Sequence, residues 1–139
     1  MEKKYEKLLD EWQERLGLQD WAIALRVNCI PQQLKSENAI GESEWVTELK
    51  CATVRIIDGK FDTDRILDFD FEKTLVHELL HIKFSMIETD INSYETSVVE
   101  SAQHQLIDDL ARALVMAKRG ETKRQLGKNV KKIINYEVK

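Results

Sequence analysis

The sequence predicts an α+β fold: an N-terminal helix, a mostly antiparallel sheet of three to four strands, two long helices packed on each other, and a helical C-terminal extension. Three patterns predict it. Apolar residues recur at helical spacing over residues 2–16, alternate with polar ones in short segments between residues 21 and 57, and return to helical spacing from residue 71 onward. Because 139 residues is a typical length for one domain, we expect a single domain over residues 1–139.

The first two elements have clear boundaries. Gly17 follows the first helix at the position where a left-handed residue commonly ends a helix. The next segment, residues 21–29, alternates apolar with polar or small side chains and ends before Pro31, as a strand does. The helical stripe that predicts the first helix consists of Tyr5, Leu8, Leu9, Trp12 and Leu16.

Two further strands are predicted in the middle of the chain. One covers residues 40–49 and the other residues 52–57, and the turn Asp58-Gly59 ends the second. The acidic segment 60–69 is irregular, although Ile66-Leu67 could form a short strand. One face of the strand at 40–49 would carry Trp45, Thr47 and Leu49.

The two long helices come next. The first covers residues 71–87, and Asp70 stands where a side chain caps a helix N-terminus. The second covers residues 94–118 and ends at Gly120. Residues 122–136 carry large apolar side chains at helical spacing, interrupted by Gly127, so we expect a helical extension that could cover part of the core. A partly extended segment is the alternative.

The composition excludes several classes of protein. The N-terminus is charged rather than apolar, and no apolar run approaches the length of a membrane span. Cys29 and Cys51 fall in predicted strands and neither begins a C-x-x-C pair, so we expect two buried thiols rather than a disulfide or a metal site. These features predict a globular protein of the reducing cytoplasm, without a membrane partner.

The net charge of −4 conceals an asymmetry. Residues 118–139 form a basic C-terminal extension with eight Lys or Arg and two Glu, a charge of +6 on an otherwise acidic chain. Such an extension could contact nucleic acid or an acidic partner. It lacks interleaved aromatic residues that would stack on bases, which favours a solvated helical face instead.

The pattern His77-Glu78-x-x-His81 is the most informative motif of the chain, and it lies inside an apolar stretch. Residues four apart share one face of a helix, so both imidazoles can reach one metal ion at zinc-ligand distances. Glu78 can take a proton from a water on the metal rather than bind the metal itself. Buried His and Glu side chains need partners, and a metal ion supplies one.

A catalytic zinc site needs a third protein ligand, and Glu100 and His104 are the candidates. They are four residues apart on the second long helix, on a face that continues through apolar Ile107 and Ala111. The pattern favours Glu100 as an inward-facing ligand at the head of this stripe, with His104 orienting Glu100 or a substrate carbonyl. The reverse assignment, with His104 as the third ligand, also fits.

With these residues the chain resembles the gluzincin zinc metallopeptidases, which arrange two helices as thermolysin does. The resemblance covers residues 74–117, and the short chain is most similar to the minimal single-domain gluzincins often encoded by phages and prophages. It implies a small zincin-like fold in which His77, His81 and Glu100 bind zinc and Glu78 is the general base.

The sequence departs from the thermolysin-like pattern at one position. Those enzymes carry an Asp four residues after the ligating Glu, and this Asp supports a ligating His, whereas here His104 stands four residues after Glu100. The support must come from elsewhere, and Asp68, Asp70 and Asp108 are candidates that the sequence does not separate.

The predicted function is zinc-dependent hydrolysis of a peptide or protein by metal-activated water, with Glu78 as general base. The tetrahedral oxyanion needs a further donor, for which Tyr94 and His104 are candidates. An exposed edge strand, residues 43–49 or 52–57, would hold an extended peptide by strand addition.

The alternative is a zinc-stabilised binding module without turnover, associated with nucleic acid through its basic extension, as in SprT-like proteins. An open metal position next to Glu78 would distinguish the enzyme from this module. Four protein ligands, with Glu100 and His104 both bound, would indicate a structural site.

Overall fold

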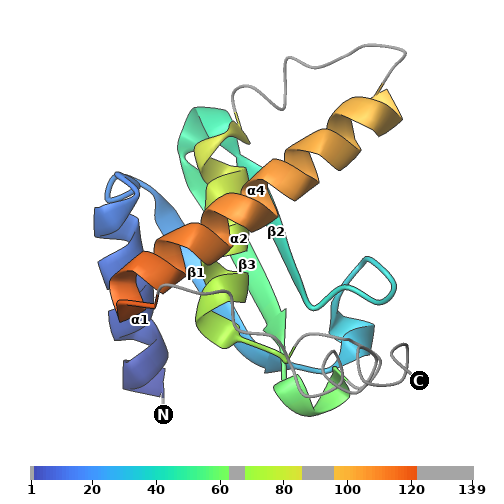
Figure 1. Ribbon diagram of the computed structural model, residues 1–139, viewed down its shortest axis with the longest axis horizontal. Helices are drawn as coiled ribbons and strands as arrows, with labels where there is room; N and C mark the ends of the chain where they lie inside the picture. Colours follow the sequence, from blue (N-terminus) through green and yellow to red (C-terminus); the bar gives the residue numbers. More distant parts are fainter. Residues whose placement is uncertain (1, 63–67, 86–95, 122–139) are drawn as a thin grey trace, which may run out of the picture.

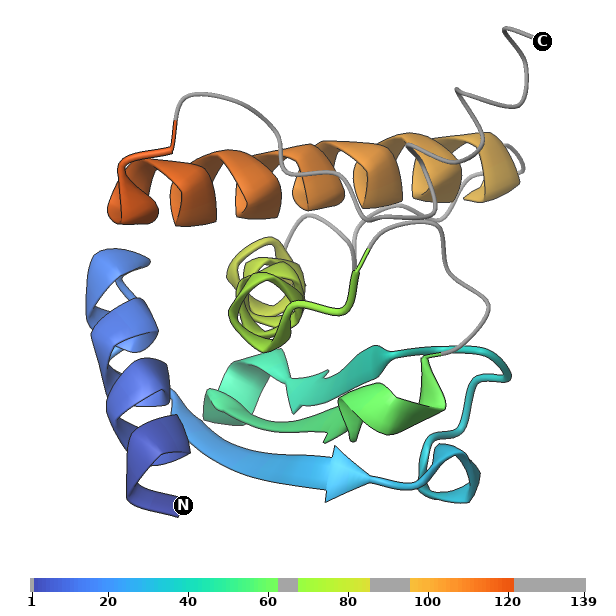
Figure 2. The ribbon, with the colours of Figure 1, turned by 60° about the horizontal axis from the view of Figure 1, so that its bottom comes forward.

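The computed structural model describes residues 2–62, 68–85 and 96–121, and within these ranges the elements form stacked layers. The sheet forms one layer, α2 (Phe71–Lys83) lies across it, and α4 (Thr96–Arg119) lies on the other side of α2 (Figure 2). The N-terminal helix α1 (Glu2–Arg15) stands at one end of these layers. This is the α+β class that the sequence predicts.

Three strands make the sheet in the described part of the chain: β1 (Ala22–Cys29), β2 (Gly41–Val46) and β3 (Cys51–Ile57), in the order β1-β3-β2. β2 pairs with β3 antiparallel, but β1 pairs with β3 parallel, so the prediction of a mostly antiparallel sheet is wrong. The chain crosses from β1 to the far edge before it returns through β3, and β3 therefore becomes the central strand (Figure 1).

β1 and β3 match their predicted ranges closely, whereas β2 is shorter than predicted. It ends at Val46, and residues Thr47–Leu49 form a 3₁₀ turn that closes with Lys50 in the left-handed region at φ 49°. Thr47 and Leu49 therefore do not continue the face of Trp45, and Leu49 is 73% exposed. The candidate short strand Ile66-Leu67 lies outside the described residues.

The buried core lies between the sheet and the helices. Alternate residues of β3, namely Ala52, Val54 and Ile56, are buried on the side of α2, and the intervening residues face away. α2 is buried on most of its circumference because it is covered by the sheet on one side and by α4 on the other. From α2 the core takes Leu75, Val76, Leu79, Leu80 and Ile82, and from α4 it takes Ile107, Ala111 and Val115.

Three helix ends follow the predicted signals, whereas α2 ends at Lys83 rather than at residue 87. Gly17 (φ +69°) and Gly120 (φ +71°) end α1 and α4 in the left-handed conformation that glycine adopts at low cost. The Asp70 carboxylate accepts a hydrogen bond of 3.1 Å from the amide of Lys73 and caps α2. No helix among residues 2–62, 68–85 and 96–121 has the length and apolarity that a membrane span requires.

Ion pairs join the N-terminus of α2 to the C-terminus of α4. Arg119 donates to both oxygens of Asp70 at 2.7 and 3.0 Å, and Lys118 pairs with Glu72, which also accepts a hydrogen bond of 2.7 Å from the indole of Trp12. Two of the eight cations of the basic extension are therefore engaged within the fold. The remaining residues of the extension, 122–139, lie outside the described residues.

Candidate metal centre

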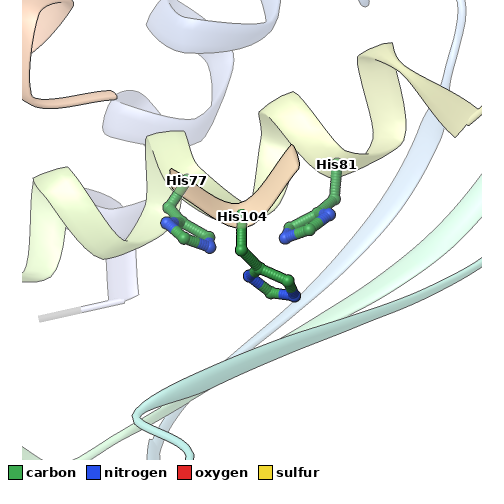
Figure 3. Close-up of side chains that lie close together, drawn as sticks. All are labelled: His77, His81 and His104. Carbon is green, nitrogen blue, oxygen red and sulfur yellow. The ribbon is translucent and has the colours of Figure 1, made fainter. Parts of the chain in front are cut away.

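Three histidines from two helices point toward one another (Figure 3). His77 and His81 come from successive turns of α2, with ring centroids 5.1 Å apart, and His104 comes from α4. The His104 ring lies 5.8 Å from that of His77 and 4.8 Å from that of His81. One ring nitrogen from each residue lies within 4.8 Å of the others, so the group could hold a metal ion.

Packing between α2 and α4 explains why His104 joins the two histidines of the motif. Ile107 and Ala111, three and seven residues after His104, are 2% and 0% exposed and belong to the core. His104 continues this face of α4 one turn beyond the core and is itself exposed. The group is therefore accessible to solvent on the side of α4.

Glu100, the other candidate ligand, lies outside this group. It stands one turn before His104 and is exposed rather than buried at the head of the core stripe. The physical reason is the length of α4, whose N-terminal turns extend past α2 and the sheet (Figure 1). The role of Glu100 as a metal ligand stays a prediction. The arrangement of the described residues favours the alternative assignment, in which His104 is the third donor.

Glu78 is buried between α2 and the sheet, with 6% of its surface exposed. Its Oε1 accepts a hydrogen bond of 3.0 Å from the Ser43 hydroxyl on β2. Sequence reasoning did not identify Ser43 as part of the site. The sequence signal that could have identified Ser43 is its position two residues before Trp45, which places both side chains on the same face of the predicted strand.

Of the three acidic candidates, Asp108 is the one that supports the motif. Its Oδ1 lies 3.3 Å from Nδ1 of His77, while Asp70 caps α2 and Asp68 is exposed. The pKa of Asp108 is held well below its usual range, first by the hydrogen bond from His77. The ammonium of Lys73 and the guanidinium of Arg112, each 2.8 Å from the Asp108 carboxylate, lower it as well. An anionic Asp108 favours a proton on Nδ1 of His77, which leaves Nε2 free to bind a metal.

Replacing Asp108 with Ala should weaken metal binding about 10- to 100-fold, because His77 loses the group that fixes its ring and tautomer. A chelator competition titration measures this loss. Asp109→Ala is the matched control, since the neighbouring carboxylate is 62% exposed and lies 3.4 Å from Arg112 rather than beside His77. Equal affinities of the two variants would contradict a supporting role for Asp108.

His81 is held neutral by its surroundings. Burial, reinforced by the nearby His77 and His104, lowers the pKa of His81 from 6.5 to about 4. The indole of Trp45 stacks near its ring, with centroids 6.5 Å apart and planes at 16°. A neutral imidazole is the form that binds metal, so protons compete little with a metal for His81 at neutral pH.

Without metal, the protein should lose stability as the pH falls from about 6.5 toward 4. In this window the unfolded chain protonates His81, whose ordinary pKa is 6.5, but the folded chain does not. The loss is at most about 3 kcal/mol, since one pH unit corresponds to about 1.4 kcal/mol. Urea unfolding in EDTA at pH 7 and 5 measures it, and the dependence should be smaller in His81→Gln. Equal stability of the wild type at both pH values would contradict the prediction.

Comparison of the chain with protein-family models, with curated protein sequences and with solved structures found no match. The interpretation of the site therefore depends on its own residues. Tyr94, a candidate donor to the oxyanion, lies outside the described residues.

Proposed function

We propose that the protein is a zinc-dependent peptidase whose metal ligands are His77, His81 and His104 and whose general base is Glu78. The observation that carries the proposal is the convergence of three ring nitrogens within 4.8 Å, with Glu78 between two of them in the sequence. Three imidazoles suit zinc as a donor set, and catalytic zinc sites use three protein ligands and keep one position for water or substrate.

The spacing on α4 also supports kinship with gluzincins of the minimal, phage-encoded type. In thermolysin-like enzymes the third ligand precedes the supporting Asp by four residues. His104 and Asp108 have this spacing, and Asp108 contacts His77. We infer that His104 occupies the position of the family's glutamate ligand, and the donor set is then three histidines rather than two histidines and a glutamate.

The chain's own residues supply the proton chemistry. A zinc ion at this site would polarise the scissile carbonyl and lower the pKa of a coordinated water. Glu78 takes the proton of the attacking water and then delivers it to the leaving nitrogen of the peptide. His104, as a ligand, would not donate to the oxyanion.

β2 is the strand that would bind the substrate. It lies at the edge of the sheet, and its side chains contact both Glu78 and His81. Its outer edge pairs with no other strand among the described residues. An extended peptide could therefore add to this edge and pass the metal. The other candidate, the strand at residues 52–57, is β3, which pairs on both sides and has no free edge.

Two features argue against the alternative of a structural zinc module bound to nucleic acid. Among the described residues the group contains three donors rather than four, and Glu100 is not one of them. Lys118 and Arg119 of the basic extension are paired with Glu72 and Asp70. Both cysteines are free thiols, which is compatible with the proposed cytoplasmic location; Cys29 is buried as expected, whereas Cys51 is only partly buried.

The test combines metal content with hydrolysis. We expect about one zinc per chain in protein purified without chelator, and cleavage of a peptide library that stops on chelation and returns when zinc is added. The metal site would be contradicted by a zinc content far below one ion per chain, if added zinc did not restore it. Full zinc content without cleavage of any peptide would favour the binding module.

A further inference from the structure

The face of β2 that points toward α2 contacts two of the three proposed functional residues of the motif helix, Glu78 and His81. Side chains alternate along a strand, so Gly41, Ser43 and Trp45 share this face. Ser43 donates to Glu78 at 3.0 Å, and Trp45 stacks near His81. The same strand thus lies against the base and against one metal ligand.

Gly41 sets how closely β2 approaches the base. A Cβ at this position would lie 3.1 Å from Oε2 of Glu78 and 2.8 Å from Cγ2 of Thr74, closer than side chains normally pack. Glycine therefore lets the backbone of β2 pass directly beside the second carboxylate oxygen. One oxygen of Glu78 is held by the Ser43 hydroxyl, and the other is bounded by the strand at Gly41.

We propose that Ser43 is a positioning residue, which holds the Glu78 carboxylate in the orientation that accepts the proton of the attacking water. The inference rests on the proposed function and adds a residue to it. A carboxylate rotates about its last side-chain bonds unless a partner fixes it. A general base must be ionised before it accepts a proton. In that state of Glu78 the Ser43 hydroxyl donates to a charged acceptor, and such a bond is stronger than one between neutral groups.

This arrangement couples the base to the substrate strand. A peptide added to the outer edge of β2 would lie beside the strand that also carries the Ser43 hydroxyl. The distance from the scissile bond to Glu78 would then be set by the contact between β2 and α2 alone. Because orientation accounts for a large part of catalysis, a loss of this contact should lower kcat more than it raises KM.

The test compares three full-length variants with the wild type. Ser43→Ala removes the hydroxyl, Ser43→Thr keeps it on a side chain suited to a strand, and Thr53→Val removes a hydroxyl from the outward face of β3 as a control. We expect kcat to fall about tenfold or more in Ser43→Ala, as for loss of a hydrogen bond to a charged group, with KM and zinc affinity unchanged. Ser43→Thr should restore kcat, and Thr53→Val should not change it.

Two further measurements separate a positioning role from a general structural one. In a Glu78→Gln background, Ser43→Ala should cause no additional loss, because Ser43 acts through Glu78. The ¹³C resonance of the Glu78 side-chain carboxyl should shift in Ser43→Ala but not in Thr53→Val, a result that requires no activity.

The outcomes distinguish this inference from the proposed function. If the wild type hydrolyses peptides and Ser43→Ala is equally fast, the positioning role is wrong. If the wild type hydrolyses no peptide, the proposed function fails, and the carboxyl resonance decides whether Ser43 holds Glu78. An unchanged resonance in Ser43→Ala would overturn the inference in either case.

Discussion

Glu78→Gln should abolish peptide hydrolysis while leaving the metal bound. The amide has nearly the same shape as the carboxylate but cannot accept the proton of the attacking water, so we expect kcat to fall about 10²- to 10⁴-fold. Zinc affinity should stay within a few-fold of the wild type, because in the proposed site the donors are His77, His81 and His104. Initial rates on a cleaved peptide, together with metal analysis of the same samples, measure both quantities.

Glu14→Gln provides the matched control, because it makes the same chemical change outside the site. Glu14 is exposed on α1, an element that contributes no residue to the proposed site. It should keep wild-type activity. Hydrolysis at the wild-type rate in Glu78→Gln would exclude Glu78 as the base and point to contaminating protease or to another residue.

Local signals predicted the helices well because their ends depend on a few adjacent residues. Gly17, Asp70 and Gly120 each act through the backbone of their own helix terminus, and each lies where the sequence indicated. The first long helix was predicted to reach residue 87, whereas α2 ends at Lys83. Helix termini within apolar stretches carry weaker signals than those marked by glycine or a capping side chain.

The arrangement of the strands was less predictable. Alternation in residues 22–29 and 51–57 marks strands but not their partners, and the parallel pairing of β1 with β3 depends on the path of the whole chain. The end of β2 was missed because Thr47 and Leu49 continue the alternation of the strand. Their 3₁₀ turn is closed by Lys50, which is a residue that rarely adopts positive φ and gives no sequence signal.

The site illustrates the same limit. His77 and His81 come together through a four-residue spacing within one helix, which a sequence displays directly. Glu100 and His104 lie on the same face of α4, so their helical positions are equivalent and the sequence could not separate them. The point where α4 crosses α2 decides between them, and tertiary packing of Ile107 and Ala111 sets that point. For the same reason Asp108 emerged as the partner of His77 only in the folded chain.

His104→Ala should weaken zinc binding more than Glu100→Ala does. Loss of one of three donors should cost more than about 100-fold in affinity, beyond the 10- to 100-fold typical of supporting residues. Glu100 is exposed and outside the histidine group, so its removal should have little effect. Both side chains are exposed, and neither truncation should leave a cavity in the core, which circular dichroism can verify.

A competition titration with a chelator of known zinc affinity at pH 7 gives the ranking. His104→Glu serves as a chemical control, because a carboxylate at this position would recreate the two-histidine, one-glutamate donor set of the gluzincins. It should recover part of the affinity that His104→Ala loses. If Glu100→Ala instead released zinc more readily than His104→Ala, the third ligand would be Glu100. The N-terminal turns of α4 would then have to move toward α2 when the metal binds.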